Sequence, residues 1–235
     1  MNSRYFSFSC IVTFLLALSY GCVPAKYIQL SSENANKIHS SKAYSVITQE
    51  EIIPQVDESK VAMAMGGGLL AALVDVAVDS HRSKKAEQEI APLRQVISDY
   101  DFRKEFWSQL QVELKSSKRF TIGELVTSTK PLSDDEQTLL AKNISEDALF
   151  TVITDYSLSP DYRSLNINSS VSLWLKGTKE KIYLEKLVYN SPAIDSEPGE
   201  PAITKWKANN GELYRTTLYQ GIQEIIKLLH AKLLS

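Results

Sequence analysis

Hydrophobic and polar residues alternate along three successive stretches in the second half of the chain. The alternation is clearest over residues 165–175, and residues 149–158 and 181–190 show related patterns. Because successive side chains of a strand point to opposite faces, this spacing predicts strands with one buried and one wet face. Turn-forming residues separate the stretches, at Ser159-Pro160-Asp161 and at Gly177-Thr178-Lys179. The pattern therefore predicts an antiparallel three-strand meander.

Apolar residues recur at helical intervals elsewhere in the chain. One such stretch runs from Ile90 to Leu114, with a break near residues 99–101. A capping box at Ser133 and Glu136 predicts the start of a second helix. A final helix is expected after Asn209-Asn210-Gly211, and its apolar stripe would pack on the sheet. The stripe consists of Leu218, Ile222, Ile225, Ile226, Leu229 and Leu233.

Shorter candidate strands at residues 43–53 and 119–127 complete the pattern. We therefore expect an α+β fold, in which a mixed or antiparallel sheet with a three-strand meander is packed by helices, including a C-terminal helix. The expected single domain covers residues 43–235. Residues 22–42, rich in Ser, Asn and Lys, are expected to form a tether.

The first 21 residues have the order of a signal peptide. Arg4 precedes an apolar core of nine residues, Cys10 to Leu18. This core is short for a membrane span, which needs about 20 apolar residues. Gly21-Cys22 resembles the bacterial lipoprotein box, in which a small residue precedes a cysteine that receives lipid. The chain departs from that pattern at Leu18, which lies one place further from the cysteine than usual, and at the bulky Tyr20.

The resemblance implies that residues 1–21 are removed and that Cys22 carries acyl chains, palmitate among them, which anchor the chain to a membrane. Val23 follows the cysteine, whereas in lipoproteins kept at the inner membrane this position usually holds aspartate. The resemblance therefore implies the periplasmic face of the outer membrane. The alternatives are an ordinary secretory signal and an uncleaved signal anchor.

Residues 61–78 form a second apolar segment, which contains Gly66-Gly67-Gly68. Its uncharged part, Val61 to Val74, is too short to span a bilayer. We favour a buried hinge and helix within the same domain, because short apolar runs usually belong to a core. The alternative is contact with the membrane or with a second copy, since small residues let helices approach closely and would permit a homo-oligomer.

The composition disfavours several classes of function. The chain has 26 Lys and Arg against 28 Asp and Glu, so it lacks the basic excess that nucleic-acid binding needs. The three histidines, His39, His81 and His230, do not have metal-binding spacing, and Cys22 would be the one cysteine of the mature chain. The sequence therefore predicts no catalytic residue, no metal site and no cofactor.

Polar and aromatic residues gather around the first strand of the predicted meander. Asp155, Tyr156, Asp161 and Tyr162 are the densest such group, and Trp174 stands on the polar side of the next strand. A large aromatic side chain at such a position needs a helix or a partner to cover it. These five residues form the candidate binding patch. The alternative is turn chemistry and a solvated sheet edge, because Asp is common in turns.

From about residue 90 to the end, the chain resembles small periplasmic α/β domains of envelope-assembly lipoproteins, such as the curli secretion lipoprotein and activators of penicillin-binding proteins. The resemblance depends on the order of elements and on Ile-Thr-Asp-Tyr156, which ends a strand before a meander and a terminal helix. It implies a non-catalytic, lipid-anchored binding or assembly accessory protein with an envelope protein as partner. The alternatives are an envelope hydrolase acting on cell wall or glycan, and a self-associating structural subunit of an outer-membrane complex.

Overall fold

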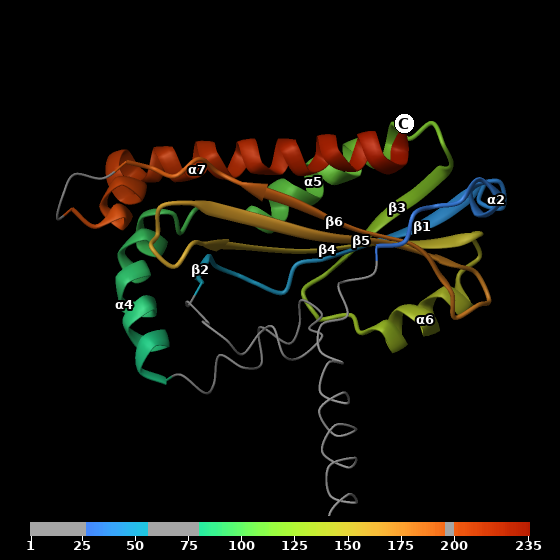
Figure 1. Cartoon of the computed structure of the whole chain (residues 1–235), viewed down its shortest axis with the longest axis horizontal. Coiled ribbons are helices and arrows are strands. Elements are labelled where there is room, and N and C mark those ends of the chain that lie inside the picture. Colours follow the sequence, from blue (N-terminus) through green and yellow to red (C-terminus); the bar gives the residue numbers. More distant parts are fainter. Residues whose placement is uncertain (1–26, 56–79, 196–199) are drawn as a thin grey trace, which may run out of the picture. The chain divides into compact units, whose positions relative to one another are not determined.

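The computed structural model describes residues 27–55, 80–195 and 200–235. Within them, the strands pair into a sheet in the order β3-β1-β4-β5-β6, and β2 pairs with β4 (Figure 1). The strands are β1 (Ser40–Val46), β2 (Ile53–Pro54), β3 (Thr121–Ser128), β4 (Ala148–Leu158), β5 (Leu165–Leu175) and β6 (Lys181–Asn190). The helices are α2 (Ser32–Ala35), α4 (Ser80–Val96), α5 (Phe102–Lys115), α6 (Asp134–Asn143), α7 (Ala202–Leu229) and the π-helical η3 (His230–Leu234).

The sheet is mixed, which is one of the two arrangements that the sequence pattern predicted. β1 pairs in parallel with both β3 and β4, whereas β4, β5 and β6 form the predicted antiparallel meander. Helices α5 and α7 cover one face of the sheet, and α6 covers part of the other (Figure 1). The α+β fold with a meander and a packed C-terminal helix is therefore confirmed.

The N-terminal boundary of the domain differs from the predicted one. The strand expected over residues 43–53 is divided into β1 and β2, and β1 already begins at Ser40. Upstream, Ile28 makes an isolated bridge with Leu184 of β6. Part of the segment assigned to the tether therefore belongs to the domain.

Small polar residues in buried positions explain this difference. Ser41 and Ser45 of β1 are fully buried. The Ser41 hydroxyl donates to the carbonyl of Ala148, and the Ser45 hydroxyl accepts from the indole of Trp107. Buried polar groups need hydrogen-bond partners, and the partners of these serines lie far away along the chain. The sequence of the strand alone therefore resembles that of a polar linker.

Helix α7 packs its predicted apolar stripe on the sheet. All six predicted stripe residues are buried. The helix starts earlier than expected, however, because helical residues from Ala202 precede a kink with non-helical backbone at residues 208–211. Asn209, Asn210 and Gly211 have positive φ there, a conformation that Asn and Gly tolerate best. The Asn-Asn-Gly sequence therefore joins two helical pieces instead of opening one helix.

Gly221 of α7 lies close to side chains of the sheet. A Cβ atom at this position would lie 2.6 Å from Cδ1 of Tyr189 in β6 and 2.7 Å from Cδ1 of Ile167 in β5. Real Cβ contacts are longer than this, so a side chain at position 221 would force Tyr189 and Ile167, or the helix itself, to shift.

We predict that Gly221→Val lowers the free energy of unfolding by about 1–3 kcal/mol, the usual cost of overpacking a core. Gly123→Ala in β3 is the matched control, because its added Cβ would meet the nearest atom, the Ser41 carbonyl oxygen, at an ordinary 3.7 Å. Chemical denaturation of both variants measures the difference. A Gly221→Val chain as stable as the parent would show that α7 does not press on the sheet at this point.

A candidate binding groove at the edge of the sheet

The structure places Tyr156 of the predicted patch in the core. Its side chain is 3% exposed, and its ring centroid lies 4.0 Å from that of Phe102 in α5. The Gln49 side chain accepts from the backbone N–H of Tyr156 and donates to the backbone carbonyl of Tyr156. Tyr156 therefore joins α5, β4 and the segment after β1, and it is not available to a ligand.

Asp155 precedes Tyr156 in β4 and points to the other face of the sheet. The Asn168 amide of β5 donates to its carboxylate at 3.0 Å. Burial raises the pKa of Asp155, and the bond from Asn168 opposes that rise.

Asp161 and Tyr162 form the turn between β4 and β5. The Asp161 carboxylate accepts from the Ser159 hydroxyl and from the backbone N–H of Arg163. Tyr162 has a positive φ of 57°, and its carbonyl accepts from the indole of Trp206 at 2.6 Å. These contacts stabilise the turn and attach it to the first helical piece of α7.

Trp174 is 4% exposed because α6 covers it. Its indole donates to Gln137 of α6 at 2.9 Å, and Gln137 also accepts from the Thr151 hydroxyl. Trp174 pairs with Leu149 near the start of β4, six residues from Asp155 and hence about 20 Å along the strand. The structure therefore does not bring the five patch residues into one surface, and the cover that Trp174 needs comes from its own chain.

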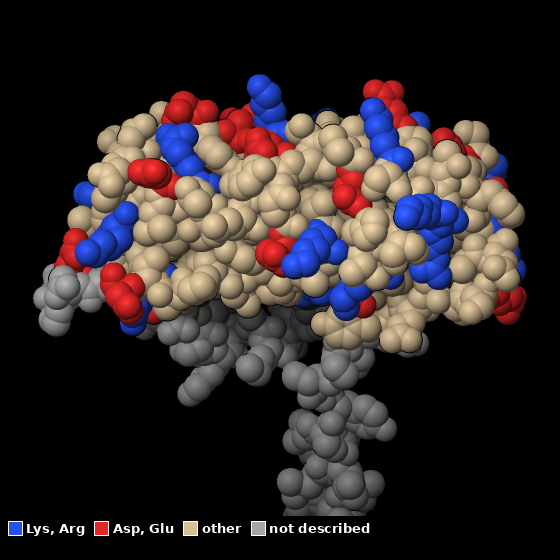
Figure 2. Space-filling view, turned by 90° about the horizontal axis from the view of Figure 1, so that it is seen from above, with Lys and Arg blue, Asp and Glu red and all other residues tan. Residues whose placement is uncertain are grey.

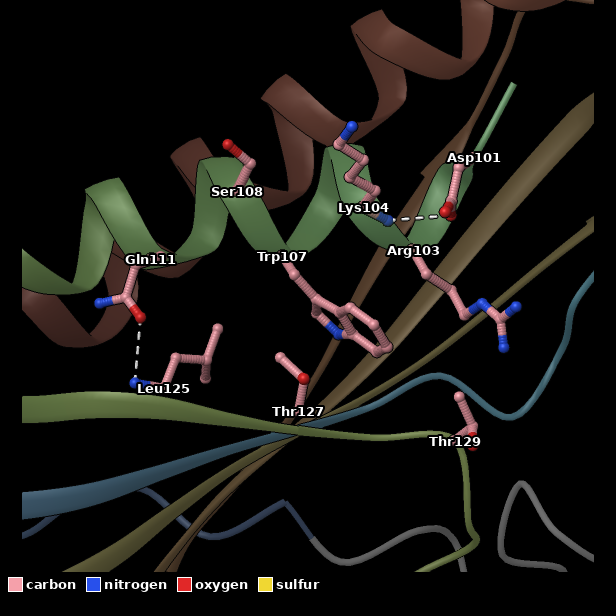
Figure 3. Close-up of a pocket in the computed structure, with 9 residues that line it drawn as sticks. All are labelled: Asp101, Arg103, Lys104, Trp107, Ser108, Gln111, Leu125, Thr127 and Thr129. Carbon is pink, nitrogen blue, oxygen red and sulfur yellow. Dashed lines mark hydrogen bonds between the residues drawn. The ribbon is translucent and has the colours of Figure 1, made fainter. Parts of the chain in front are cut away.

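A different set of residues lines a groove of about 570 Å³ between α5 and β3 (Figure 3). The lining residues are Asp101, Arg103, Lys104, Trp107, Ser108, Gln111, Leu125, Thr127 and Thr129. Those before residue 116 come from α5 or its N-cap, and the others come from β3 or directly follow it.

The sequence of α5 explains the helical wall of the groove. Asp101 caps the helix by accepting from the Lys104 N–H at 3.0 Å. The buried stripe of Phe102, Phe106, Leu110 and Leu114 fixes how the helix is rotated on the core. Arg103, Trp107 and Gln111 recur every four residues, so they form one row beside that stripe and face β3.

The other wall is an edge strand. β3 ends the strand order and pairs with β1 on one side, so its other edge has no strand partner within the described residues. The N–H of Leu125 on that outer edge donates to the Gln111 side-chain oxygen at 3.0 Å, whereas the Ser128 carbonyl accepts from Ile47 toward β1. Since backbone groups alternate along a strand, the N–H and carbonyl of Thr127 face outward like those of Leu125.

The polar groups of the groove are only partly engaged. The Nε2 atom of Gln111 is buried and has no hydrogen-bond partner. Arg103 lies 3.6 Å from the exposed Glu50, a distance typical of a weak surface pair. Trp107 donates to Ser45 at 3.1 Å and contributes its ring to the groove. The arrangement offers the outward backbone groups of β3 and the Trp107 ring, which suits an extended peptide.

Sequence reasoning missed this groove. The four-residue spacing of Arg103, Trp107 and Gln111 was a readable signal, but nothing in the sequence showed that β3 would be the outermost strand.

The apolar segment at 61–78 and the anchor at Cys22 lie outside the described residues. Within the described ranges, no three His, Cys, Asp or Glu side chains gather to hold a metal ion, and no helix has the length and apolarity to cross a membrane.

No protein-family model matches the chain, and no curated protein does. Among solved structures, the hypothetical protein CT253 from Chlamydia trachomatis aligns over 83% of this chain and 97% of its own, with 10% identity and a TM-score of 0.39. An uncharacterized protein aligns over 87% of this chain and 96% of its own, with 12% identity and a TM-score of 0.23. Likeness this weak carries no argument about function.

The contributions of Asp155 and Asp161 to the free energy of unfolding should change with pH in opposite directions. Burial raises the pKa of Asp155 in the folded protein, so the stability linked to that group is present below its unfolded pKa of about 3.9 and is lost as the pH rises through the folded value. The Ser159 hydroxyl lowers the pKa of Asp161, so stability linked to that group is lost as the pH falls. We predict that Asp155→Asn raises the free energy of unfolding at neutral pH and that Asp161→Asn lowers it. Both differences should narrow in acid, as denaturant titrations across pH would measure. If the free energies of unfolding of Asp155→Asn and of the parent differed by the same amount at every pH, the raised pKa of Asp155 would be contradicted.

Proposed function

We propose that this chain is a lipid-anchored, non-catalytic binding or assembly accessory protein of the bacterial envelope, held at the periplasmic face of the outer membrane. The N-terminal segment supports the anchor, because an apolar core too short to span a bilayer precedes Gly21-Cys22. The domain that follows supports a binding role, since one strand edge of its sheet has no strand partner among the described residues and lies beside a groove.

The outer edge of β3 is the observation that carries this proposal. An extended segment of a partner protein can add to such an edge as a further strand, with backbone hydrogen bonds for affinity and side-chain pockets for specificity. The outward N–H and carbonyl of Thr127 supply the backbone contacts. The partner is therefore an envelope protein with an extended segment, bound without chemical change.

The groove supplies contacts for one face of the added strand. Every second side chain of the partner segment would point toward α5, where the Trp107 ring gives an apolar contact between Arg103 and Gln111. Meanwhile, the Gln111 oxygen already occupies the Leu125 N–H, which limits pairing to the part of β3 beyond Leu125.

For the anchor, we predict that Cys22→Ser abolishes labelling of the chain by radioactive palmitate and releases it from the membrane fraction. The thiol is the group that takes the lipid, and a hydroxyl does not replace it. The control is Cys10→Ser, which removes the cysteine inside the apolar core and should leave labelling intact. Palmitate incorporated equally into Cys22→Ser and parent chains would rule out Cys22 as the attachment site.

For the groove, we predict that Thr127→Pro weakens peptide binding at least about tenfold, the equivalent of one hydrogen bond of about 1.4 kcal/mol. Proline removes the outward N–H of an edge strand but leaves the β1–β3 hydrogen bonds in place. The probes are decapeptides selected on the parent protein from a phage-displayed random library, with affinity measured by fluorescence anisotropy. Trp107→Ala should weaken the same peptides.

The matched control is Thr121→Val at the start of β3, which changes an exposed side chain of this strand away from the groove and should leave affinity unchanged. Melting temperatures confirm that each variant is folded. Failure of the library to yield any binder, or peptides that bind a folded Thr127→Pro chain as tightly as the parent, would refute binding at the β3 edge.

A further inference from the structure

Arg103 holds its guanidinium largely out of water without a hydrogen bond. Its side chain is 21% exposed, and none of its N–H groups donates a hydrogen bond within the described residues. The carboxylate of Glu50 lies 3.6 Å from Nη2, which is longer than such a bond. Because Glu50 is itself well exposed, this pair contributes little. The five guanidinium donors therefore have no close acceptor among the described residues.

Two other arginines of similar exposure show how such a side chain is normally satisfied. Arg94 is 19% exposed, and it donates to the carbonyl of Ile52 at 2.9 Å and 2.7 Å. Arg215 is 23% exposed, and it donates to the carboxylate of Asp99 from two nitrogens. A cation withdrawn from water needs acceptors that replace its hydration. Of these three arginines, Arg103 is the one that lacks them in the part of the chain that the structure describes.

The position of Arg103 directs its donors to the groove between α5 and β3. In Figure 3 its side chain extends beyond the Trp107 ring, on the side of Thr129. Lys104 adds a second positive charge to the lining. Asp101 is the one carboxylate of the lining, and it already accepts from the backbone N–H of Lys104. This end of the groove is therefore complementary to an acidic group.

The charge of the whole molecule does not supply that complementarity. The chain has 26 Lys and Arg against 28 Asp and Glu, and the two kinds are interspersed over much of the face shown in Figure 2. A general positive field, which would attract any acidic molecule, therefore does not arise from this composition. Recognition of an acidic group depends on the local donors of the groove.

The spacing of Arg103 and Trp107 fits an extended segment. The two residues are four apart on α5, or about 6 Å along the helix axis. Side chains on one face of a strand are two residues apart, or about 6.6–6.8 Å. Neighbouring side chains on one face of a strand added to β3 can therefore meet Trp107 and Arg103 in turn. Gln111 already occupies the Leu125 N–H, so these contacts lie beside Thr127 and beyond it.

We propose that Arg103 binds a carboxylate side chain of the partner segment, which thus carries Asp or Glu two residues from the apolar residue that meets Trp107. The inference depends on the proposed binding at the β3 edge, and it adds the chemistry of the partner. Guanidinium and carboxylate form two parallel N–H···O bonds, which are stronger than bonds between neutral groups. The acidic residue precedes the apolar one if the segment runs antiparallel to β3, and it follows if the segment runs parallel.

The test compares acidic peptides with their neutral amide counterparts on the full chain. Decapeptides selected from the random library on the parent are synthesised with an amidated C-terminus, so that side chains supply the only carboxylates. Each Asp or Glu is changed in turn to Asn or Gln, and affinity is measured by fluorescence anisotropy. At the position that meets Arg103, this change should weaken binding about tenfold, since a hydrogen bond to a charged group is lost.

Variants of the protein assign the effect to Arg103. Arg103→Ala should bind the acidic peptide and its amide counterpart with equal affinity, because the two changes remove the same interaction. The matched control is Arg119→Ala, which removes an exposed arginine outside the groove and should keep the tenfold preference. Glu50→Gln should tighten binding of the acidic peptide, since it removes the carboxylate that competes for Arg103. Melting temperatures confirm that each variant is folded.

The outcomes separate the carboxylate contact from strand addition. Acidic and amide peptides that bind the parent equally, yet lose affinity for Thr127→Pro, overturn the contact with Arg103 and leave binding at the edge in place. An acidic preference that persists in Arg103→Ala also overturns that contact. Peptides that need Arg103 but bind Thr127→Pro as tightly as the parent support the contact and refute addition to β3. A library that yields no binder overturns both.

Discussion

The parallel pairing of β1 on both of its sides is the constraint on which the other features of this fold depend. β1 lies between β3 and β4, and the chain reaches β3 first and returns across β1 to reach β4. Connections between parallel strands are almost always right-handed, so a step in one direction and a step back place their helices on opposite faces. Accordingly, α5 covers one face and α6 the other, and the return across β1 leaves β3 outermost (Figure 1).

The proposed peptide-binding groove follows from this order of strands and helices. In the part of the chain that the structure describes, the outermost β3 has a backbone edge without a strand partner. Helix α5 lies over β3 because the same crossover connects β1 to β3. The row of Arg103, Trp107 and Gln111 thereby becomes one wall of the groove.

Local patterns in the sequence predicted the meander and the helices because those signals lie within short stretches. The alternation in β5 and the stripe of α7 each fit a single period, and the capping box at Ser133 is present as expected. Long-range contacts decided the rest. The buried serines of β1 look like a linker until Ala148 and Trp107 are seen beside them. In the same way, Trp174 looks exposed until Gln137 and α6 cover it, and Tyr156 is buried because Phe102 packs on its ring.

The free outer edge of β3 can be tested most directly by residue-resolved amide hydrogen exchange on the mature protein without a partner. Within the described residues, the N–H groups of Val126 and Ser128 face β1, and that of Thr127 faces away from it. The account predicts slow exchange at residues 126 and 128 and fast exchange at residue 127, since an amide without a protein acceptor exchanges without opening of the sheet. Protection at Thr127 equal to that of its two neighbours would mean that this edge is already occupied, and it would contradict binding of a partner strand there.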